Sequence, residues 1–154
     1  MNKGRTWLIV GGGLSLAAAL AHLAAIVGGP DWYRFFGAGE PIAQAAERGS
    51  LVPPLLTLGI ASILALWAAY AFAGAGLIRR LPLMRLALVA ISAIYLLRGA
   101  MVFMPATFNR PDLSPAFMFW SSLIVLIYGI VYAVGTWRAW PHLTRRREAN
   151  ALGS

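Results

Sequence analysis

The sequence predicts an all-α membrane protein: a bundle of four transmembrane helices with an ordered loop between the first two. Of the 154 residues, 60% are hydrophobic and 12% are charged, whereas about a quarter of the residues in a soluble domain are charged. The apolar residues form four nearly uncharged stretches, each long enough to cross a hydrocarbon core of about 30 Å. Four such spans use most of the chain, so we expect a single membrane domain.

Charged residues and prolines set the limits of the spans. The first span has no charge between Arg5 and Asp31, and the second ends before Arg79. The third contains one charge, Arg98, and the fourth ends before Pro141, which cannot donate a backbone hydrogen bond. We therefore expect spans at residues 7–28, 51–78, 85–104 and 114–138, an outer loop at 29–50 and a basic tail at 139–154.

The charges outside the spans predict the orientation in the membrane. With both termini in the cytoplasm, nine basic residues and one acidic residue face inside, and three basic and four acidic residues face outside. The inside group contains Lys3, Arg5, Arg79, Arg80, Arg85, Arg138, Arg145, Arg146, Arg147 and Glu148, and the outside group contains Arg34, Arg48, Arg110, Asp31, Glu40, Glu47 and Asp112. The positive-inside rule then places both termini in the cytoplasm of a bacterial inner membrane.

The net charge of +8 has a bearing on partners as well. A basic face along a soluble domain would indicate nucleic acid, but here the basic residues lie beside hydrophobic spans. We therefore expect membrane lipids, and no nucleic acid, as partners.

The basic start, the apolar run and the small residues Ala17 to Ala21 also resemble a secretory signal peptide, whose cleavage would leave three spans in the same orientation.

Small residues recur at four-residue spacing in the first two spans. The first carries Gly11, Ser15 and Ala19, and the second carries Ala61, Ala65, Ala69 and Ala73. Such stripes let helix backbones approach closely in lipid, where no hydrophobic effect drives association. We expect the first two helices to pack together; formation of a homo-oligomer, or binding to another membrane protein, through either stripe is the alternative.

The absence of cysteine excludes disulfides, thiolate nucleophiles, Cys-ligated zinc and iron–sulfur clusters. One histidine, His22, lies within a span, and the other, His142, lies on the opposite side, so the chain does not supply the paired axial ligands of a membrane haem. No residue pattern indicates a metal site or identifies a cofactor.

His22 and Arg98 are the two ionisable residues within the spans, and such residues mark functional sites by default because they are costly in hydrocarbon. Each lies six residues before the outer end of its span, roughly 9 Å below the surface. Thr57 in the second span and the pair Ser121-Ser122 in the fourth lie at a similar depth. We expect a pocket there, with Tyr95 as its floor and Trp120 as its wall. In the alternative, Arg98 snorkels to the headgroups and His22 makes one interhelical hydrogen bond.

The outer loop is expected to cover this pocket. Asp31 is placed to cap a short aromatic helical turn over residues 32–36, and Glu40 before Pro41 starts a second helix running to Gly49. The aromatic residues would lie on the membrane interface as a lid. Asp31 or Glu40 would then provide the counter-charge to Arg98.

The chain resembles the small DoxX-like inner-membrane proteins of bacteria. The resemblance lies in the layout of four spans in about 150 residues with basic cytoplasmic ends, and in the block Gly28-Gly29-Pro30 followed by Tyr33-Arg34-Phe35-Phe36-Gly37. It implies membership among largely uncharacterised proteins, some linked to quinol or redox partners, and it carries no catalytic motif.

Three functional hypotheses follow. The first is a protein that binds a lipophilic molecule, such as a lipid, quinone or isoprenoid, in an outer-leaflet cavity with His22, Arg98, Glu40, Tyr95, Ser121 and Trp120 as ligand-binding residues. The second is an enzyme acting on such a ligand, with His22 as acid or base and Arg98 as electrostatic stabiliser. The third is a structural or accessory subunit of a membrane complex that uses its small-residue faces to bind another protein.

Overall fold

The computed structural model describes residues 3–105, 109, 111 and 113–151, and the side chains of all of these except 144–151. Arg110 and Asp112, which enter the charge count above, and residues 152–154 of the expected tail lie outside the described residues. The same holds for the side chains of Arg145 to Glu148.

The described part of the chain is helical and contains no strand. Four helices are long and apolar enough to cross a membrane, which confirms the all-α fold with four candidate membrane-spanning helices. The long helices are α1 (Lys3–Gly28), α4 (Val52–Gly74), α5 (Met84–Ala100, continued by the 3-10 turn η1, Met101–Phe103) and α6 (Pro115–Ala151), and the short ones are α2 (Pro30–Phe35) and α3 (Glu40–Glu47).

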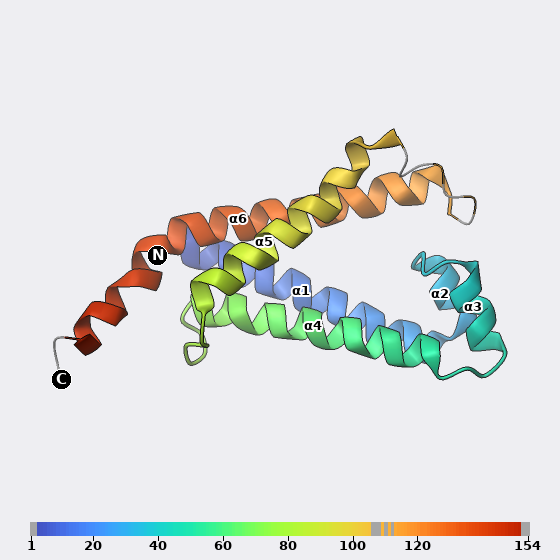
Figure 1. The fold of residues 1–154 in the computed structure, drawn as a ribbon, viewed down its shortest axis with the longest axis horizontal. Helices are drawn as coiled ribbons and strands as arrows, with labels where there is room; N and C mark the ends of the chain where they lie inside the picture. The colour runs from blue at the N-terminus through green and yellow to red at the C-terminus, as the bar shows by residue number, and fades with distance from the viewer. Residues whose placement is uncertain (1–2, 106–108, 110, 112, 152–154) are drawn as a thin grey trace.

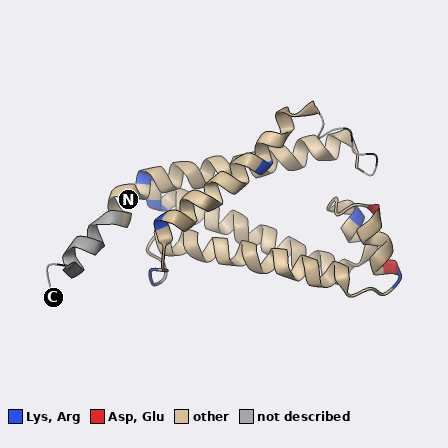
Figure 2. Ribbon diagram, viewed as in Figure 1, with Lys and Arg blue, Asp and Glu red and all other residues tan. Residues whose placement is uncertain are grey.

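The long helices form two antiparallel pairs, α1 with α4 and α5 with α6, and α1 also packs on α6 (Figure 1). The start of α1, the end of α6 and the α4–α5 connection lie together at what we call the terminal end. Helices α2 and α3 and the α5–α6 connection lie at the opposite end, the α2–α3 end, toward which the two pairs diverge (Figure 1). Lys and Arg gather at the terminal end, and Asp and Glu lie on α2 and α3 (Figure 2).

Glycine makes the close helix contacts possible. A Cβ on Gly99 of α5 would lie 2.4 Å from the Leu126 Cα in α6, and one on Gly129 of α6 would lie 2.8 Å from the Leu96 amide nitrogen. At the terminal end, a Cβ on Gly4 would lie 2.6 Å from the amide nitrogen of Ala139. The helix backbones therefore lie in direct contact at these points. In lipid, where no hydrophobic effect drives helices together, such van der Waals contacts stabilise their packing.

Helices α1 and α4 pack along small residues, as the stripes predict, but α4 is rotated from the expected stripe. Of the expected stripe, Ala61 and Ala73 are buried, Ala69 is half-buried and Ala65 is exposed. Ala68 and Ala71, which lie outside the stripe, are buried. The buried positions follow the spacing of three and four residues that keeps one face of a helix toward its neighbour. The expected spacing of four throughout drifts off that face because a turn has 3.6 residues.

A buried hydroxyl cluster lies in the middle of the bundle. The Ser15 hydroxyl is hydrogen-bonded to the hydroxyls of Tyr95, at 2.9 Å, and Tyr132, at 2.7 Å. Tyr132 also lies within hydrogen-bonding distance of the Trp67 carbonyl oxygen, and Trp67 packs edge-on against Tyr95. Ser15 and Tyr132 have no exposed surface. The cluster joins all four long helices, since the residues come from α1, α4, α5 and α6.

Two of the long helices end at other residues than the spans expected from the sequence. Helix α4 ends at Gly74, four residues before Ile78, because Gly76 adopts φ +75° and the amides of Gly76 and Leu77 bond back to carbonyls of the last turn. Helix α6 continues past Pro141 to Ala151. A proline inside a helix removes one backbone bond, and Leu143, packed in the main apolar cluster, holds the helix beyond it in place.

Large apolar side chains on every long helix remain exposed, including Leu20, Leu58, Leu97 and Ile127. A soluble bundle rarely leaves so much apolar surface in water. Tryptophans lie near the helix ends at the terminal end, where the Arg138 guanidinium stacks over Trp7 and that of Arg85 over Trp140. Both features are typical of helices that face lipid between two interfacial belts.

Candidate functional site

A cavity of about 550 Å³ lies at the α2–α3 end, between α1, α5 and α6. Its walls bring together His22 of α1, Arg98 of α5, and Trp120 and Ser121 of α6, four of the six residues singled out from the sequence. We call it the His22–Arg98 cavity. The rest of its lining is mostly apolar: Ala18, Ala21, Ala25, Phe36, Gly37, Leu113, Phe117, Met118, Ile124, Val125 and Tyr128.

The alanines of α1 make room for the cavity. Ala18, Ala21 and Ala25 occupy the stretch of α1 that faces α6, where larger side chains would fill the space. Across from them α6 presents larger residues such as Phe117 and Val125. The helix pairs diverge at this level (Figure 1), and the small residues on one wall leave the volume between them unfilled.

Arg98 reaches α6 from α5. Its Nη1 donates a 3.1 Å hydrogen bond to the Ser122 hydroxyl, which has no exposed surface. The guanidinium has five N–H donors in a planar fork, and this neutral contact uses one of them. The remaining donors suit a carboxylate, phosphate or carbonyl oxygen, which a guanidinium binds through two parallel hydrogen bonds.

His22 has a defined tautomer. Its Nδ1 lies 2.8 Å from the carbonyl oxygen of Ala18, one turn earlier in α1. A carbonyl only accepts hydrogen bonds, so Nδ1 carries the proton and donates it. In the neutral ring, Nε2 then has a free lone pair, which accepts a hydrogen bond or a proton. The cavity therefore combines a cationic donor with an imidazole whose Nε2 is the acceptor in the neutral ring.

The connection between α2 and α3, residues 36–39, covers the cavity. We call α2, this connection and α3 together the α2–α3 cover. Gly37 has φ +71°, and a Cβ there would lie 2.1 Å from the ring of Phe117 in α6. Glycine is thus required both for the left-handed turn that ends α2 and for the contact with Phe117. Tyr33 anchors the cover from below, buried against Ala25 of α1 and Ala43 of α3.

The predicted partners of Arg98 were wrong. Glu40 and Asp31 do not line the cavity; both bind Arg34 of α2 instead. The guanidinium of Arg34 donates to Glu40 at 2.8 and 2.9 Å and to Glu47 at 2.7 Å, and it lies 3.4 Å from Asp31. Arg34 lies three residues from Asp31 and six from Glu40, much nearer in sequence than Arg98. It is therefore the cation that these carboxylates bind. Asp31 lies in the first turn of α2 and does not cap it.

This ion-pair group ties α2 to α3. Hydrogen bonding from Arg34 lowers the pKa of Glu40 below its ordinary value, and the same bonds raise the pKa of Arg34 above its ordinary value. Because the side chains lie at the surface, solvent screens their attraction. Their role is to hold the cover in one arrangement.

Tyr95 lies below the cavity and does not line it. Its hydroxyl is taken by Ser15, and its ring packs against Tyr128, which does line the cavity, at a centroid distance of 5.6 Å. The floor is therefore Tyr128, supported by Tyr95. Ser122 was expected at the depth of Arg98, but its hydrogen bond with Arg98 was not. Phe36, one of the aromatic residues expected in the lid, lines the cavity together with Phe117, which was not singled out from the sequence.

Comparison with known protein families, curated proteins and solved structures finds no match to this chain.

Proposed function

We propose that this chain is a four-helix protein of the bacterial inner membrane, with both termini in the cytoplasm, that binds a lipophilic molecule in the His22–Arg98 cavity. One observation carries the proposal: a largely apolar cavity of about 550 Å³ is lined by an arginine from α5 and a histidine from α1. Binding sites for small molecules have this size and this combination of apolar walls with a few polar groups. The ligand would be a lipid, quinone or isoprenoid in the outer leaflet.

The polar groups suit a head group with oxygen atoms. Arg98 would bind a carbonyl, carboxylate or phosphate oxygen with the donors that Ser122 leaves free. The Nε2 atom of His22 would accept a hydrogen bond from a hydroxyl. The apolar residues of α1 and α6 would contact the hydrocarbon part of the ligand. The layout that resembles DoxX-like proteins, some of which are linked to quinol partners, supports a ligand of this kind.

The test compares wild type with Arg98→Leu. Both proteins are purified in one mild detergent, bound lipids are extracted and identified by mass spectrometry, and thermal unfolding is followed. We expect Arg98→Leu to lose the co-purifying lipophile and to keep or gain stability, because its partner Ser122 is neutral and no buried acid is left unpaired. Arg138→Leu, an exposed arginine that does not line the cavity, is the control. Destabilisation with an unchanged lipid profile would contradict the proposal.

An enzyme acting on the same ligand is the second candidate, favoured by the tautomer of His22. A ring whose Nδ1 donates to a carbonyl leaves Nε2 as the basic atom of its neutral form, which is the arrangement that general base catalysis needs. The isolated co-purifying molecule, returned to ligand-free protein, would then be chemically changed by wild type but not by His22→Gln. Recovery of the unchanged molecule from both would exclude this candidate, and absence of any bound molecule would favour a structural subunit.

The proposed orientation has its own test. Since the chain has no cysteine, Ser50→Cys and Leu77→Cys each introduce a single thiol, one beside α3 at the α2–α3 end and one in the α4–α5 connection. An impermeant maleimide should label position 50 but not position 77 on intact spheroplasts. The reverse pattern would invert the topology and place the His22–Arg98 cavity in the inner leaflet.

A further inference from the structure

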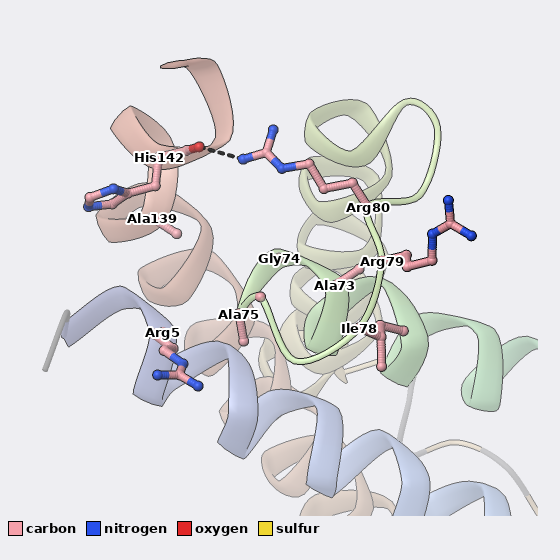
Figure 3. A pocket seen from close by; sticks show the side chains of 10 residues that line it. Arg5, Ala73, Gly74, Ala75, Ile78, Arg79, Arg80, Ala139 and His142 are labelled. Carbon is pink, nitrogen blue, oxygen red and sulfur yellow. Dashed lines mark hydrogen bonds between the residues drawn. The ribbon is translucent and has the colours of Figure 1, made fainter. Parts of the chain in front are cut away.

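A second cavity, of about 480 Å³, lies at the terminal end (Figure 3). It is bounded by the start of α1, the end of α4 with the connection that follows, and α6 near Ala139. Its lining includes Arg5, Arg79, Arg80 and His142, and no Asp or Glu among the described residues. We call it the arginine cavity. It lies at the opposite end of the bundle from the His22–Arg98 cavity.

The backbone at the end of α4 brings the arginines to this place. Gly76, with φ +75°, turns the chain, so that the α4–α5 connection passes close to α6. Arg80 then reaches α6, where its Nη2 donates a 2.6 Å hydrogen bond to the His142 carbonyl (Figure 3). This contact immobilises the guanidinium. Ordering the side chain in advance lowers the entropy lost when it binds an anion.

The positive charge in the cavity has no described counter-charge. The ion pairs among the described residues all involve Arg34, at the far end of the molecule. Arg5 lies across the cavity from Arg80, while Arg79 points to the other side of the α4–α5 connection (Figure 3). Arg5 and Arg80 are therefore placed to bind an anion directly, and Arg79 adds to the positive potential.

The size and the rest of the lining indicate the class of ligand. A phosphate ion alone would leave most of 480 Å³ unfilled. The other lining residues are small or apolar, such as Ala75, Ile78 and Ala139, and they suit the glycerol and first methylene groups of a lipid. The nearby stacking of Arg138 on Trp7 marks a level typical of the headgroup boundary.

We propose that the arginine cavity binds the phosphate group of an anionic phospholipid of the inner leaflet, through Arg5 and Arg80. Guanidinium groups bind phosphate through paired hydrogen bonds, and basic pockets between membrane helices on the cytoplasmic side bind anionic headgroups. The assignment to the inner leaflet rests on the proposed orientation with both termini in the cytoplasm, but neither binding event requires the other.

Native mass spectrometry of the purified full chain tests this, by counting bound lipids as phosphatidylglycerol or phosphatidylcholine is added. Both lipids contain a phosphodiester, but only phosphatidylglycerol carries net charge. We expect phosphatidylglycerol to bind more tightly, and Arg5→Gln to weaken that binding about tenfold. Arg138→Gln removes the same charge at the same end but does not line the cavity, so it should retain the affinity. Arg80→Gln should resemble Arg5→Gln.

Arg5→Gln is the decisive variant because none of the hydrogen bonds or ion pairs found among the described residues involves the Arg5 side chain, so the fold does not depend on it. Equal losses for Arg5→Gln and Arg138→Gln would mean attraction to the basic surface as a whole and would overturn the proposal. So would equal binding of the two lipids. A thermal shift with inorganic phosphate that matches the shift with phosphatidylglycerol, at equal ionic strength, would overturn the assignment to a lipid.

Discussion

The two ends of the bundle differ in what lies between α1 and α6. At the terminal end, Gly4 brings the backbones of the two helices into contact, and Gly135 of α6 meets Leu8 of α1. Toward the α2–α3 end, alanines of α1 face bulky residues of α6 across an unfilled cavity that contains Arg98 and His22. Close packing needs glycine at the point of contact, and a cavity forms where no complementary side chain fills the gap.

The buried polar groups differ in the same way. In the middle of the bundle, Ser15, Tyr95 and Tyr132 satisfy one another's hydroxyls within the protein. In the cavity, Arg98 and His22 each have one hydrogen-bond partner among the described residues and retain polar atoms for another molecule. The first arrangement stabilises a fold, and the second is suited to a ligand.

The largest expected effect is on the helix contacts. Gly99→Val should lower the free energy of unfolding by about 3 kcal/mol, because the Cβ would lie 2.4 Å from the Leu126 Cα, and backbone atoms move only if α5 and α6 separate. Thermal unfolding in detergent measures it. Gly59→Val, at a position with open space around it in α4, is the matched control and should change stability by less than about 0.5 kcal/mol. Similar melting of both variants would refute tight α5–α6 packing.

The hydroxyl cluster should give the next largest effect. Ser15→Ala removes the partner of both tyrosine hydroxyls and leaves that of Tyr95 buried without its bond, at a cost of about 1–3 kcal/mol. The comparison is Ser62→Ala, which removes an exposed hydroxyl bonded only to the Leu58 carbonyl of its own helix. Chemical denaturation of the two variants should separate them clearly; equal stability would show that the cluster contributes nothing to the fold.

Two buried tyrosines, one in the hydroxyl cluster and one at the α2–α3 end, should respond differently to loss of the hydroxyl. Tyr132→Phe removes hydrogen bonds and should lower stability by about 1–2 kcal/mol. The hydroxyl of Tyr33 is buried without a hydrogen-bond partner among the described residues, so Tyr33→Phe should leave stability unchanged or raise it by up to about 1 kcal/mol. Both are measured by the same melting experiment, and a loss in Tyr33→Phe as large as in Tyr132→Phe would contradict the contrast.

The smallest effect should be the pH response of the α2–α3 cover. The lowered pKa of Glu40 means that its bond to Arg34 contributes fully above the ordinary value of 4.5 and is lost as pH falls through the lowered value. A spin label on Ala38→Cys should therefore become more mobile only at pH below the ordinary pKa of 4.5. In an Arg34→Gln background the label should already be mobile at pH 7. Equal mobility in both backgrounds at pH 7 would show that the ion pairs do not hold the cover.

Local patterns in the sequence predicted the elements well. Hydropathy located the four long helices, and the turn residues located α2 and α3, with Glu40 as the first residue of α3. These features depend on residues close together in the chain. The depth count along separate helices also brought His22, Arg98, Ser121 and Trp120 to one level, because the rise per residue of a helix is constant.

The remaining features depend on how the helices rotate and separate, which packing decides. Hydropathy is similar all round these helices, so it did not show that Ala65 faces outward, or that Tyr95 points to Ser15 and not into the cavity. The sequence suggested Asp31 or Glu40 as the counter-charge to Arg98, but the short path from Arg34 to these carboxylates decided their partner. The amino-acid sequence by itself determined the helices and the depth of their polar residues. The tertiary structure decided which polar residues meet, because only the contacts between helices set each helix's rotation about its axis.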